Sequence, residues 1–144
     1  MTVGAQAQNG EISGNGTADN PYLIASADDL AQMRDNVNAN ATGWRTAHYR
    51  LTADINLKGI DNWTPIGSEG TSANAFQGVF DGRAHSISNL KIDKETRFRT
   101  GLFGNINGAT VRNVALVNVD IKGQSEIGGI AGAGFTPAQI HGAL

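Results

Sequence analysis

The chain has 144 residues, a formal net charge of −2 at pH 7 and 40% hydrophobic residues, enough for one domain with a buried core. The mild acidity argues against a nucleic-acid surface, and we expect no membrane insertion because no apolar run approaches the roughly 18 residues that a membrane span needs. Cysteine is absent, which excludes disulfides, thiolate metal sites and a cysteine nucleophile.

The N-terminal third predicts a lead-in, a strand and a helix. Residues 1–15 are polar and glycine-rich and are expected to be flexible, while residues 16–48 contain the strand and the helix. Ser26 is suited to be the helix N-cap, and two aspartates follow in the first turn, where the helix dipole favours anions. Three apolar residues recur at helical spacing and form one stripe: Leu30, Met33 and Val37. We expect this helix, over 26–39, to cover one end of the fold.

Residues 49–132 carry short strand patterns, glycine turns and an internal repeat. Placing GVFDGRAHSISNLKI above GLFGNINGATVRNVALV aligns Gly78 with Gly101 and Asn89 with Asn113, and GGIAG begins a third copy. Such a period, in the low twenties, predicts a parallel β-solenoid. The alignment places three apolar residues beside three others: Ile87, Leu90 and Ile92 beside Val111, Val114 and Leu116.

The aligned copies share polar residues and glycines at equivalent positions. Asp54, Asn89 and Asn113 each precede an apolar pair and are expected to form one corner column, because Asx side chains tolerate turn geometry. Glycines beside buried phenylalanines predict tight bends with positive φ. These repeat positions are Gly78 with Phe80, and Gly101 and Gly104 with Phe103.

Residues 133–144 depart from the repeat. They offer neither the corner residue nor the paired apolar strand, and Pro137 removes a backbone donor from any ladder that it joins. We therefore expect an atypical C-terminal segment that leaves the last regular pass open. Unpaired strand edges associate readily, so self-association through this end of the solenoid is predicted.

Several stretches resemble a known family. GTADNPYLIASADDLAQM, YRLTADINL, WTPIG, FQGVFDGRAHSISNL, GLFG and VRNVALVNVDIKG are similar to the repeat region named for its GLUG motif. Such regions occur in bacterial cell-surface and secreted proteins, including segments that precede the zinc-peptidase domain of immunoglobulin-A-cleaving proteases. The resemblance, over roughly residues 16–132, implies an all-β fold: a short right-handed parallel β-helix with one N-terminal capping α-helix, in an adhesin-like protein.

The candidate catalytic residues do not form a recognisable site. The sequence has no His-Glu-x-x-His motif and no Gly-x-Ser-x-Gly elbow. His85 and Asp81 can be drawn as an acid–base pair, but a turn leading into the next strand explains them more simply. A glycosidase needs two facing carboxylates, and the repeat brings no two candidates to one outward face. These candidates are Asp54, Asp61, Asp81, Asp93, Glu95, Asp120 and Glu126. We predict no catalytic residues, cofactor or metal.

The remaining hypotheses concern binding. Trp44, Tyr49 and Trp63 are candidates for stacking on sugar rings, although we favour Trp63 as a plug in the side of the solenoid and Trp44 as a seat for the helix. Ala5-Gln6-Ala7 has the form of a signal-peptide cleavage site. The first hypothesis is a non-catalytic module of a secreted or cell-surface bacterial protein. Its surface would serve as a spacer or bind an unknown surface or host ligand, glycans included. The alternative is a carbohydrate-binding or polysaccharide-processing module.

Overall fold

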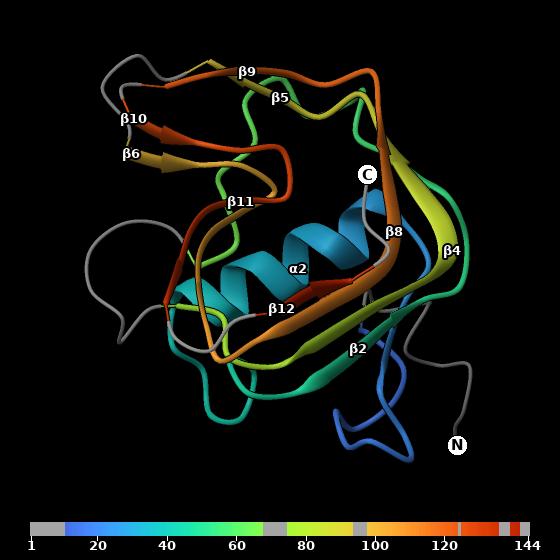
Figure 1. The fold of residues 1–144 in the computed structure, drawn as a ribbon. Coiled ribbons are helices and arrows are strands. Elements are labelled where there is room, and N and C mark those ends of the chain that lie inside the picture. Colours follow the sequence, from blue (N-terminus) through green and yellow to red (C-terminus); the bar gives the residue numbers. More distant parts are fainter. Residues whose placement is uncertain (1–10, 68–74, 94–97, 124, 136–138, 142–144) are drawn as a thin grey trace.

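The structure, a computed structural model, describes residues 11–67, 75–93, 98–123, 125–135 and 139–141, and it is mostly β-strand with one helix. The first elements are β1 (Tyr22–Ile24), α2 (Ala27–Asn38), β2 (His48–Leu51), β3 (Ile55–Asn56), β4 (Val79–Ser88) and β5 (Lys91–Asp93). The later elements are β6 (Phe98–Thr100), β7 (Phe103–Asn107), β8 (Thr110–Val117), β9 (Asp120–Lys122), β10 (Ser125–Ile127), β11 (Ala131–Phe135) and β12 (Gln139–His141). Figure 1 looks along the stack and shows the strands wound around a common interior, with α2 overlapping that interior in this view.

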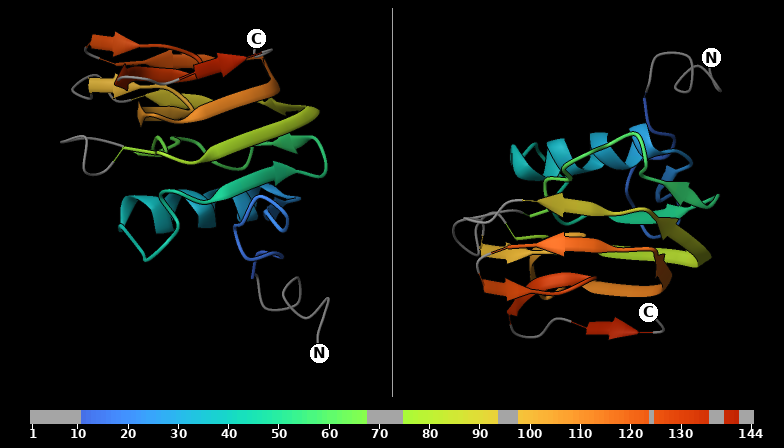
Figure 2. Two further views of the ribbon diagram at one scale, coloured as in Figure 1. Left: turned by 60° about the horizontal axis from the view of Figure 1, so that its bottom comes forward. Right: turned by 90° about the horizontal axis from the view of Figure 1, so that it is seen from above.

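Parallel pairing organises these strands. The largest sheet has the order β1-β2-β4-β8-β12, with β3 also paired to β4, and three smaller sheets pair β5 with β9, β6 with β10, and β7 with β11. All of these strand pairs are parallel. Between β8 and β12 the chain passes through the three smaller sheets, which supplies the long connection that parallel strands require. The two views of Figure 2 show successive passes stacked on one another.

The pairing extends on both sides of the expected range of 49–132. At the start, Tyr22 pairs with Tyr49, and at the end Ile140 pairs with Val111. Strand β12 lies within the segment expected to be atypical, and its backbone continues the largest sheet. The sequence pattern does not reveal this strand, because the segment lacks the corner residue and the paired apolar strand of the earlier copies. Parallel pairing uses backbone groups, and every residue except proline carries both of them.

The predicted offset between passes, in the low twenties, is wrong. Ile87 pairs with Leu116, and Ile92 pairs with Ile121, so the true offset is a little under thirty positions. The other pairs of strands have offsets close to this value. The expected stacking of Ile87 on Val111 is therefore replaced by the pairing of Phe80 with Val111.

The two phenylalanines that the repeat made equivalent belong to one pass. Phe80 pairs with Tyr49 and Val111 in the largest sheet, whereas Phe103 pairs with Ala131 in another sheet. The two rings meet edge to face inside the core, with centroids 5.5 Å apart. One pass contains two bends that have the same local requirement. At each bend a glycine lies against neighbouring backbone, and a buried phenylalanine follows two residues later. Local similarity of sequence therefore does not mean equivalence in the stack.

Asparagines do occupy the bends, but the expected column of Asp54, Asn89 and Asn113 does not form. Asn89 and Asn113 have φ of 60° and 57°, and Asn118 also has φ of 57°, a region in which asparagine is enriched among non-glycine residues. Hydrogen bonds join Asn118 to Asn89, and Asn89 to Asn56. Asn113 instead lies beside Asp81, and Asp54 accepts from the amide of Ser86. The real column follows the register of the strands.

Two of the repeat glycines, Gly78 and Gly101, are required by close approach and not by positive φ. A Cβ on Gly78 would lie 2.0 Å from the carbonyl oxygen of Ala47, and a Cβ on Gly101 would lie 2.3 Å from that of Gly128. Gly104 is buried, and its amide donates to the carbonyl of Ile66 at 2.8 Å. None of these three is among the described residues with positive φ. They allow the backbones of successive passes to come together.

The helix forms as the sequence predicts and covers the first pass. Ser26 caps it by accepting a hydrogen bond from the amide of Asp29 at 3.1 Å. The stripe of Leu30, Met33 and Val37 is fully buried. In both views of Figure 2, α2 lies at one end of the stack and β12 at the other. One cluster of buried side chains joins this helix to the strands.

Replacing Leu30 with Asp is expected to lower the free energy of unfolding by about 3 kcal/mol or more, because an unpaired charge would face the buried end of the stack. Chemical denaturation monitored by circular dichroism measures this loss. Thr42→Asp adds the same charge at an exposed position beyond the helix and is the matched control. Equal denaturation midpoints for Leu30→Asp and the parent would show that α2 does not cap the core.

Asn89→Ala is expected to destabilise the chain by about 1–2 kcal/mol, because it removes two amide hydrogen bonds and places alanine at positive φ. Asn89→Gly keeps the backbone conformation accessible and should lose less. Asn113→Gly, whose parent side chain makes one longer bond of 3.4 Å, should lose least. Midpoints of urea unfolding rank the three variants, and a larger loss for Asn113→Gly than for Asn89→Gly would contradict the column.

Candidate functional site

Two of the three aromatic residues proposed to contact a ligand lie inside the protein. Tyr49 and Trp63 are each 1% exposed. Trp63 donates from its indole nitrogen to the carbonyl of Leu102 at 3.1 Å, and the guanidinium of Arg34 lies 4.7 Å from its ring centroid. Neither ring offers a face to a sugar, and both instead hold passes of the stack together.

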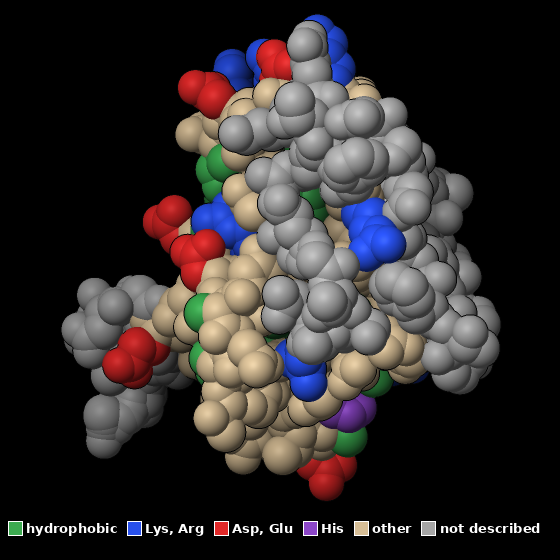
Figure 3. Space-filling model, turned by 90° about the vertical axis from the view of Figure 1, so that its left-hand side faces the viewer, with side chains coloured by type: hydrophobic (Ala, Val, Ile, Leu, Met, Phe, Trp, Pro, Cys, Tyr) green, Lys and Arg blue, Asp and Glu red, His purple; other side chains and the backbone are tan. Residues whose placement is uncertain are grey.

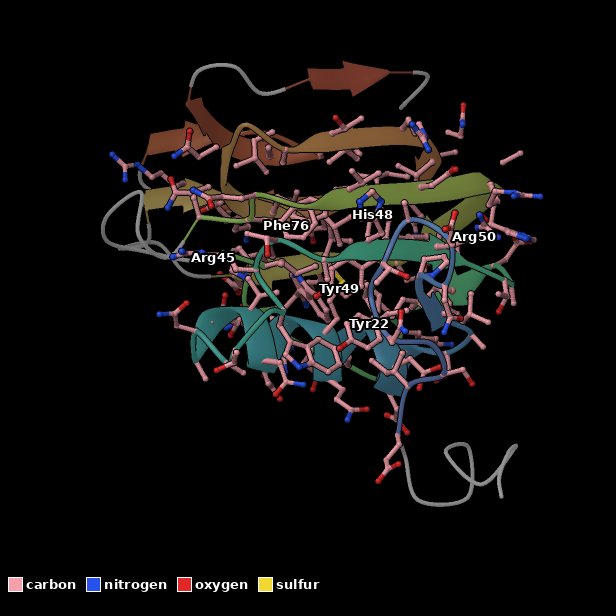
Figure 4. The ribbon with its side chains drawn as sticks, turned by 90° about the horizontal axis from the view of Figure 1, so that it is seen from below. Tyr22, Arg45, His48, Tyr49, Arg50 and Phe76 are labelled. Carbon is pink, nitrogen blue, oxygen red and sulfur yellow. The ribbon has the colours of Figure 1, made fainter. Side chains whose placement is uncertain are left out.

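The third residue, Trp44, closes an aromatic column. Its ring stacks on Tyr22 with centroids 4.2 Å apart and an interplanar angle of 6°, and Tyr49 follows at 5.5 Å from Tyr22. The column continues through Phe76 to Phe103. Figure 4 shows Tyr22, Tyr49 and Phe76 at successive levels between the helix and the upper strands. Trp44 is half-buried, and Tyr22 covers one face of its ring.

Tyr49 anchors the column to the chain that follows the helix. Its hydroxyl donates to the carbonyl oxygen of Trp44. Burial, together with the neighbouring Tyr22, raises the pKa of Tyr49 far above its ordinary value. The phenol therefore remains protonated and acts as a structural donor, not as an acid or base.

A charged column crosses the outer face of the largest sheet. Strand register aligns Arg50, Asp81 and Arg112 on β2, β4 and β8. Asp81 is 14% exposed, and its Oδ2 lies 3.3 Å from Nε of Arg112. Its Oδ1 accepts from the amide of Arg83 at 2.9 Å, where β4 is irregular and Arg83 has φ of 52°. The carboxylate thus fixes an irregular strand segment and pairs with the next pass.

Partial burial works to raise the pKa of Asp81, but hydrogen bonds from the Arg83 amide, Asn113 and Arg112 outweigh it and hold the pKa below its ordinary value. Arg50, on the other side of Asp81, has a buried Nε without a hydrogen-bond partner among the described residues. A depression of about 40 Å³ lies along this column, beside His48 and Arg50. Its volume allows a small ion at most.

His85 and Asp81, which the sequence places close together, do not form a pair. His85 Nδ1 lies 3.1 Å from Oδ1 of Asp54, and the amide of Ser86 donates to the same oxygen at 3.0 Å. The Ser86 amide, followed by His85, lowers the pKa of Asp54. Asp54 is exposed and His85 is half-buried. This contact links consecutive passes at the surface, and none of its three residues lines the depression beside His48 and Arg50.

The larger hollow lies at the corner between the largest sheet and the β5–β9 sheet. It has a volume of about 460 Å³. Its lining comes from three successive passes: Lys58, Ile60, Asp61, Asn89, Leu90, Lys91, Asn118 and Asp120. Figure 1 shows this corner at its upper right, where β4 and β8 lead into β5 and β9. Figure 3 views the opposite side of the molecule and shows acidic and basic side chains along the same top edge. We call this hollow the corner groove.

Sequence reasoning does not single out the corner groove. It treats Asp61 and Asp120 only as candidate carboxylates that the repeat does not bring to one face. The available signal is the spacing of Asn56, Asn89 and Asn118, which matches the observed strand offsets more closely than the alignment of glycines.

The described residues contain no group of three or more histidine, aspartate or glutamate side chains placed to hold a metal ion. Within the same residues, no helix has the length and apolar character needed to cross a membrane. Glu95 lies outside the described residues, and the side chain of Glu126 is not described.

Comparison with known proteins finds similarity to short segments of long chains. Halomucin of Haloquadratum walsbyi is 37% identical over 129 residues, which cover 83% of this chain and 1% of halomucin. A protein of Evansella cellulosilytica named "Putative Gly-rich membrane protein" is 36% identical over 109 residues, or 72% of this chain and 12% of that protein. An immunoglobulin A1 protease of Streptococcus pneumoniae is 34% identical over 110 residues, or 73% of this chain and 5% of the protease.

A solved structure shares the fold. The crystal structure of a "putative immunoglobulin A1 protease" from Bacteroides ovatus superposes with a TM-score of 0.64 and 29% identity, over 78% of this chain and 31% of that one. No family model matches the chain. The two protease relatives agree with the context that the GLUG resemblance implied. The chain is thus similar to a segment found within longer proteins, and it spans between 1% and 12% of the three relatives matched by sequence.

The lowered pKa of Asp81 predicts a pH-dependent contribution to stability. Its carboxylate stabilises the fold fully above the unfolded aspartate pKa of about 3.9, and the contribution is lost as the pH falls through the lower folded value. Asp81→Asn should therefore be less stable than the parent at pH 7, and the difference should shrink as the solution is acidified below both values. Urea denaturation across this range measures the difference. Arg112→Gln keeps the carboxylate but removes one partner, so its own pH-dependent loss should be smaller.

Proposed function

We propose that the chain is a non-catalytic GLUG-type module, a short right-handed parallel β-helix of a secreted or cell-surface bacterial protein, with a structural spacer or adhesive role. The observation that carries this proposal is the continuous parallel pairing of β1 to β12, in which each pass adds backbone hydrogen bonds to the one before. Such a stack lengthens by adding passes and does not require a new core. It therefore suits a protein that must extend from a surface or present a long face.

The relatives support this proposal. One is named a membrane protein, one is a halomucin and one is an immunoglobulin A1 protease, and the similar segment is a small part of each. One segment type shared by proteins with such different names favours a modular role over a catalytic one. The short match to the protease does not bring its activity to this chain.

A polysaccharide-processing role is less well supported. Asp54 is held by His85 and the Ser86 amide, and Asp81 is held by Arg112. These two carboxylates already have structural hydrogen-bond partners. Asp61 and Asp120 do line the open corner groove, but both are exposed, whereas a glycosidase sets the acid of its carboxylate pair in an apolar surrounding. Binding without cleavage is the carbohydrate-related role that the corner groove favours.

The two ends of the stack differ. Helix α2 covers the first pass, whereas among the described residues β9, β10, β11 and β12 pair on one side only. Their outer edges present backbone donors and acceptors that another strand can satisfy. We propose that a second copy of the chain pairs there. Because the other end is covered, two copies can meet only open end to open end, which closes a dimer and stops further growth.

Light scattering across a concentration series tests this arrangement. We expect the average mass to rise from one chain towards two and to stop there. Ile121 is half-buried on β9 at the open edge, so Ile121→Asp should shift the midpoint of dimer formation to higher concentration. Val79 is also half-buried but lies on β4, away from that edge, and Val79→Asp serves as the control. A mass that stays at one chain at all concentrations would contradict the open edge, and growth into long polymers would contradict the helical cap.

A further inference from the structure

The corner groove is built from equivalent positions of three passes. Lys58 and Asp61 come from the chain after β3, Asn89 and Lys91 from the end of β4 and the start of β5, and Asn118 and Asp120 from the end of β8 and the start of β9. Register pairs Lys91 with Asp120 directly. The groove therefore runs along the stack, and its lining repeats at the spacing of parallel strands, about 4.8 Å.

An amide ladder forms one wall. Asn118 donates from Nδ2 to Oδ1 of Asn89 at 2.6 Å, and Asn89 donates from Nδ2 to Oδ1 of Asn56 at 2.8 Å. A primary amide has two N–H groups and an oxygen with two lone pairs, so each of these residues keeps unused hydrogen-bonding capacity. The Oδ1 atom of Asn118 accepts no hydrogen bond from the described residues. The ladder fixes the side chains and leaves donors and acceptors available.

The charged side chains of the groove have equal numbers of positive and negative charges, and they form no salt bridges with described residues. Two lysines and two aspartates line it, and all four are exposed: Lys58, Asp61, Lys91 and Asp120. Because their charges cancel, the groove does not select for an anion or a cation. It presents strong acceptors and strong donors side by side, and a neutral hydroxyl group, which both donates and accepts, can use both.

The floor of the groove is apolar. Leu90 is fully buried beneath it, and Ile60 is half-buried and packs against the core. Because Leu90 has no exposed surface, Ile60 is the apolar side chain that a ligand would contact. A ligand that fits this lining must have polar groups at its edges and a C–H face towards Ile60. Sugar rings have this character, and the sugars of an extended chain repeat at an interval close to that of the stacked strands.

We propose that the corner groove binds a neutral, extended glycan, with Asp61 and Asp120 accepting from sugar hydroxyls and with Asn118 and the lysines donating to sugar oxygens. This assignment rests on the proposed function, since it names the ligand class of the module's adhesive surface. An extended peptide, whose backbone also repeats, is the competing ligand and is an outcome of the test.

Isothermal titration calorimetry of the full chain with cellohexaose and with N-acetylchitohexaose tests the site. We expect binding of at least one hexasaccharide, weakened about tenfold or more by Asp120→Ala and by Lys91→Ala, since each change removes a charged hydrogen-bonding group. Asp93→Ala is the matched control, because Asp93 is exposed on the same strand as Lys91 but does not line the groove. Its affinity should stay close to that of the parent.

Binding of neither hexasaccharide at millimolar concentration would overturn the proposal, as would affinity that Asp120→Ala leaves unchanged. Titration with a decapeptide of alternating lysine and aspartate tests the competing ligand. The proposal would also be overturned if the parent bound this peptide but neither hexasaccharide, and if Asp120→Ala abolished the peptide binding. Light scattering on the same samples keeps the two proposals distinct. If the chain dimerises but binds no hexasaccharide, the proposed module stands and the proposed glycan site is contradicted.

Discussion

Backbone hydrogen bonding between successive parallel passes is the constraint on which the rest of the structure depends. Once Ile87 is fixed against Leu116, the same register sets which side chains meet in the core and which face solvent. The aromatic column from Trp44 to Phe103 follows from it, as do the close approaches at Gly78 and Gly101. Aromatic pairs of this kind contribute about 0.5–1.5 kcal/mol each beyond burial, so they reinforce the register and do not create it.

The sequence predicted local structure better than it predicted which residues occupy equivalent positions in successive passes. The helix, its Ser26 cap and its buried stripe follow from interactions between residues a few positions apart, and all are present. The mostly β character also follows from local patterns. The offset between passes does not, because a glycine before an apolar residue is needed at more than one bend of a pass. Phe80 and Phe103 satisfy similar local rules in different sheets, and only backbone pairing distinguishes them.

The candidate site is harder to predict for the same reason. Trp44, Tyr49 and Trp63 are candidates because aromatic rings can stack on sugars, but their positions relative to the core depend on long-range contacts. Trp63 donates its indole hydrogen bond to the carbonyl of Leu102, 39 positions further along the sequence, between β6 and β7. The corner groove needs three passes in correct register before its charges and amides come together, so no short sequence motif predicts it.

The corner is also the place where structural and binding roles are compatible. A strand in the middle of a sheet has its backbone groups occupied, and its inward side chains belong to the core. At the corner, Asn89 and Asn118 adopt positive φ, and the amide of each secures a neighbouring pass from the surface of the stack. The same side chain can therefore hold the stack and keep hydrogen-bonding capacity for a ligand. In a longer array every added pass would extend both the ladder and the groove, so length would increase reach and the number of binding positions together.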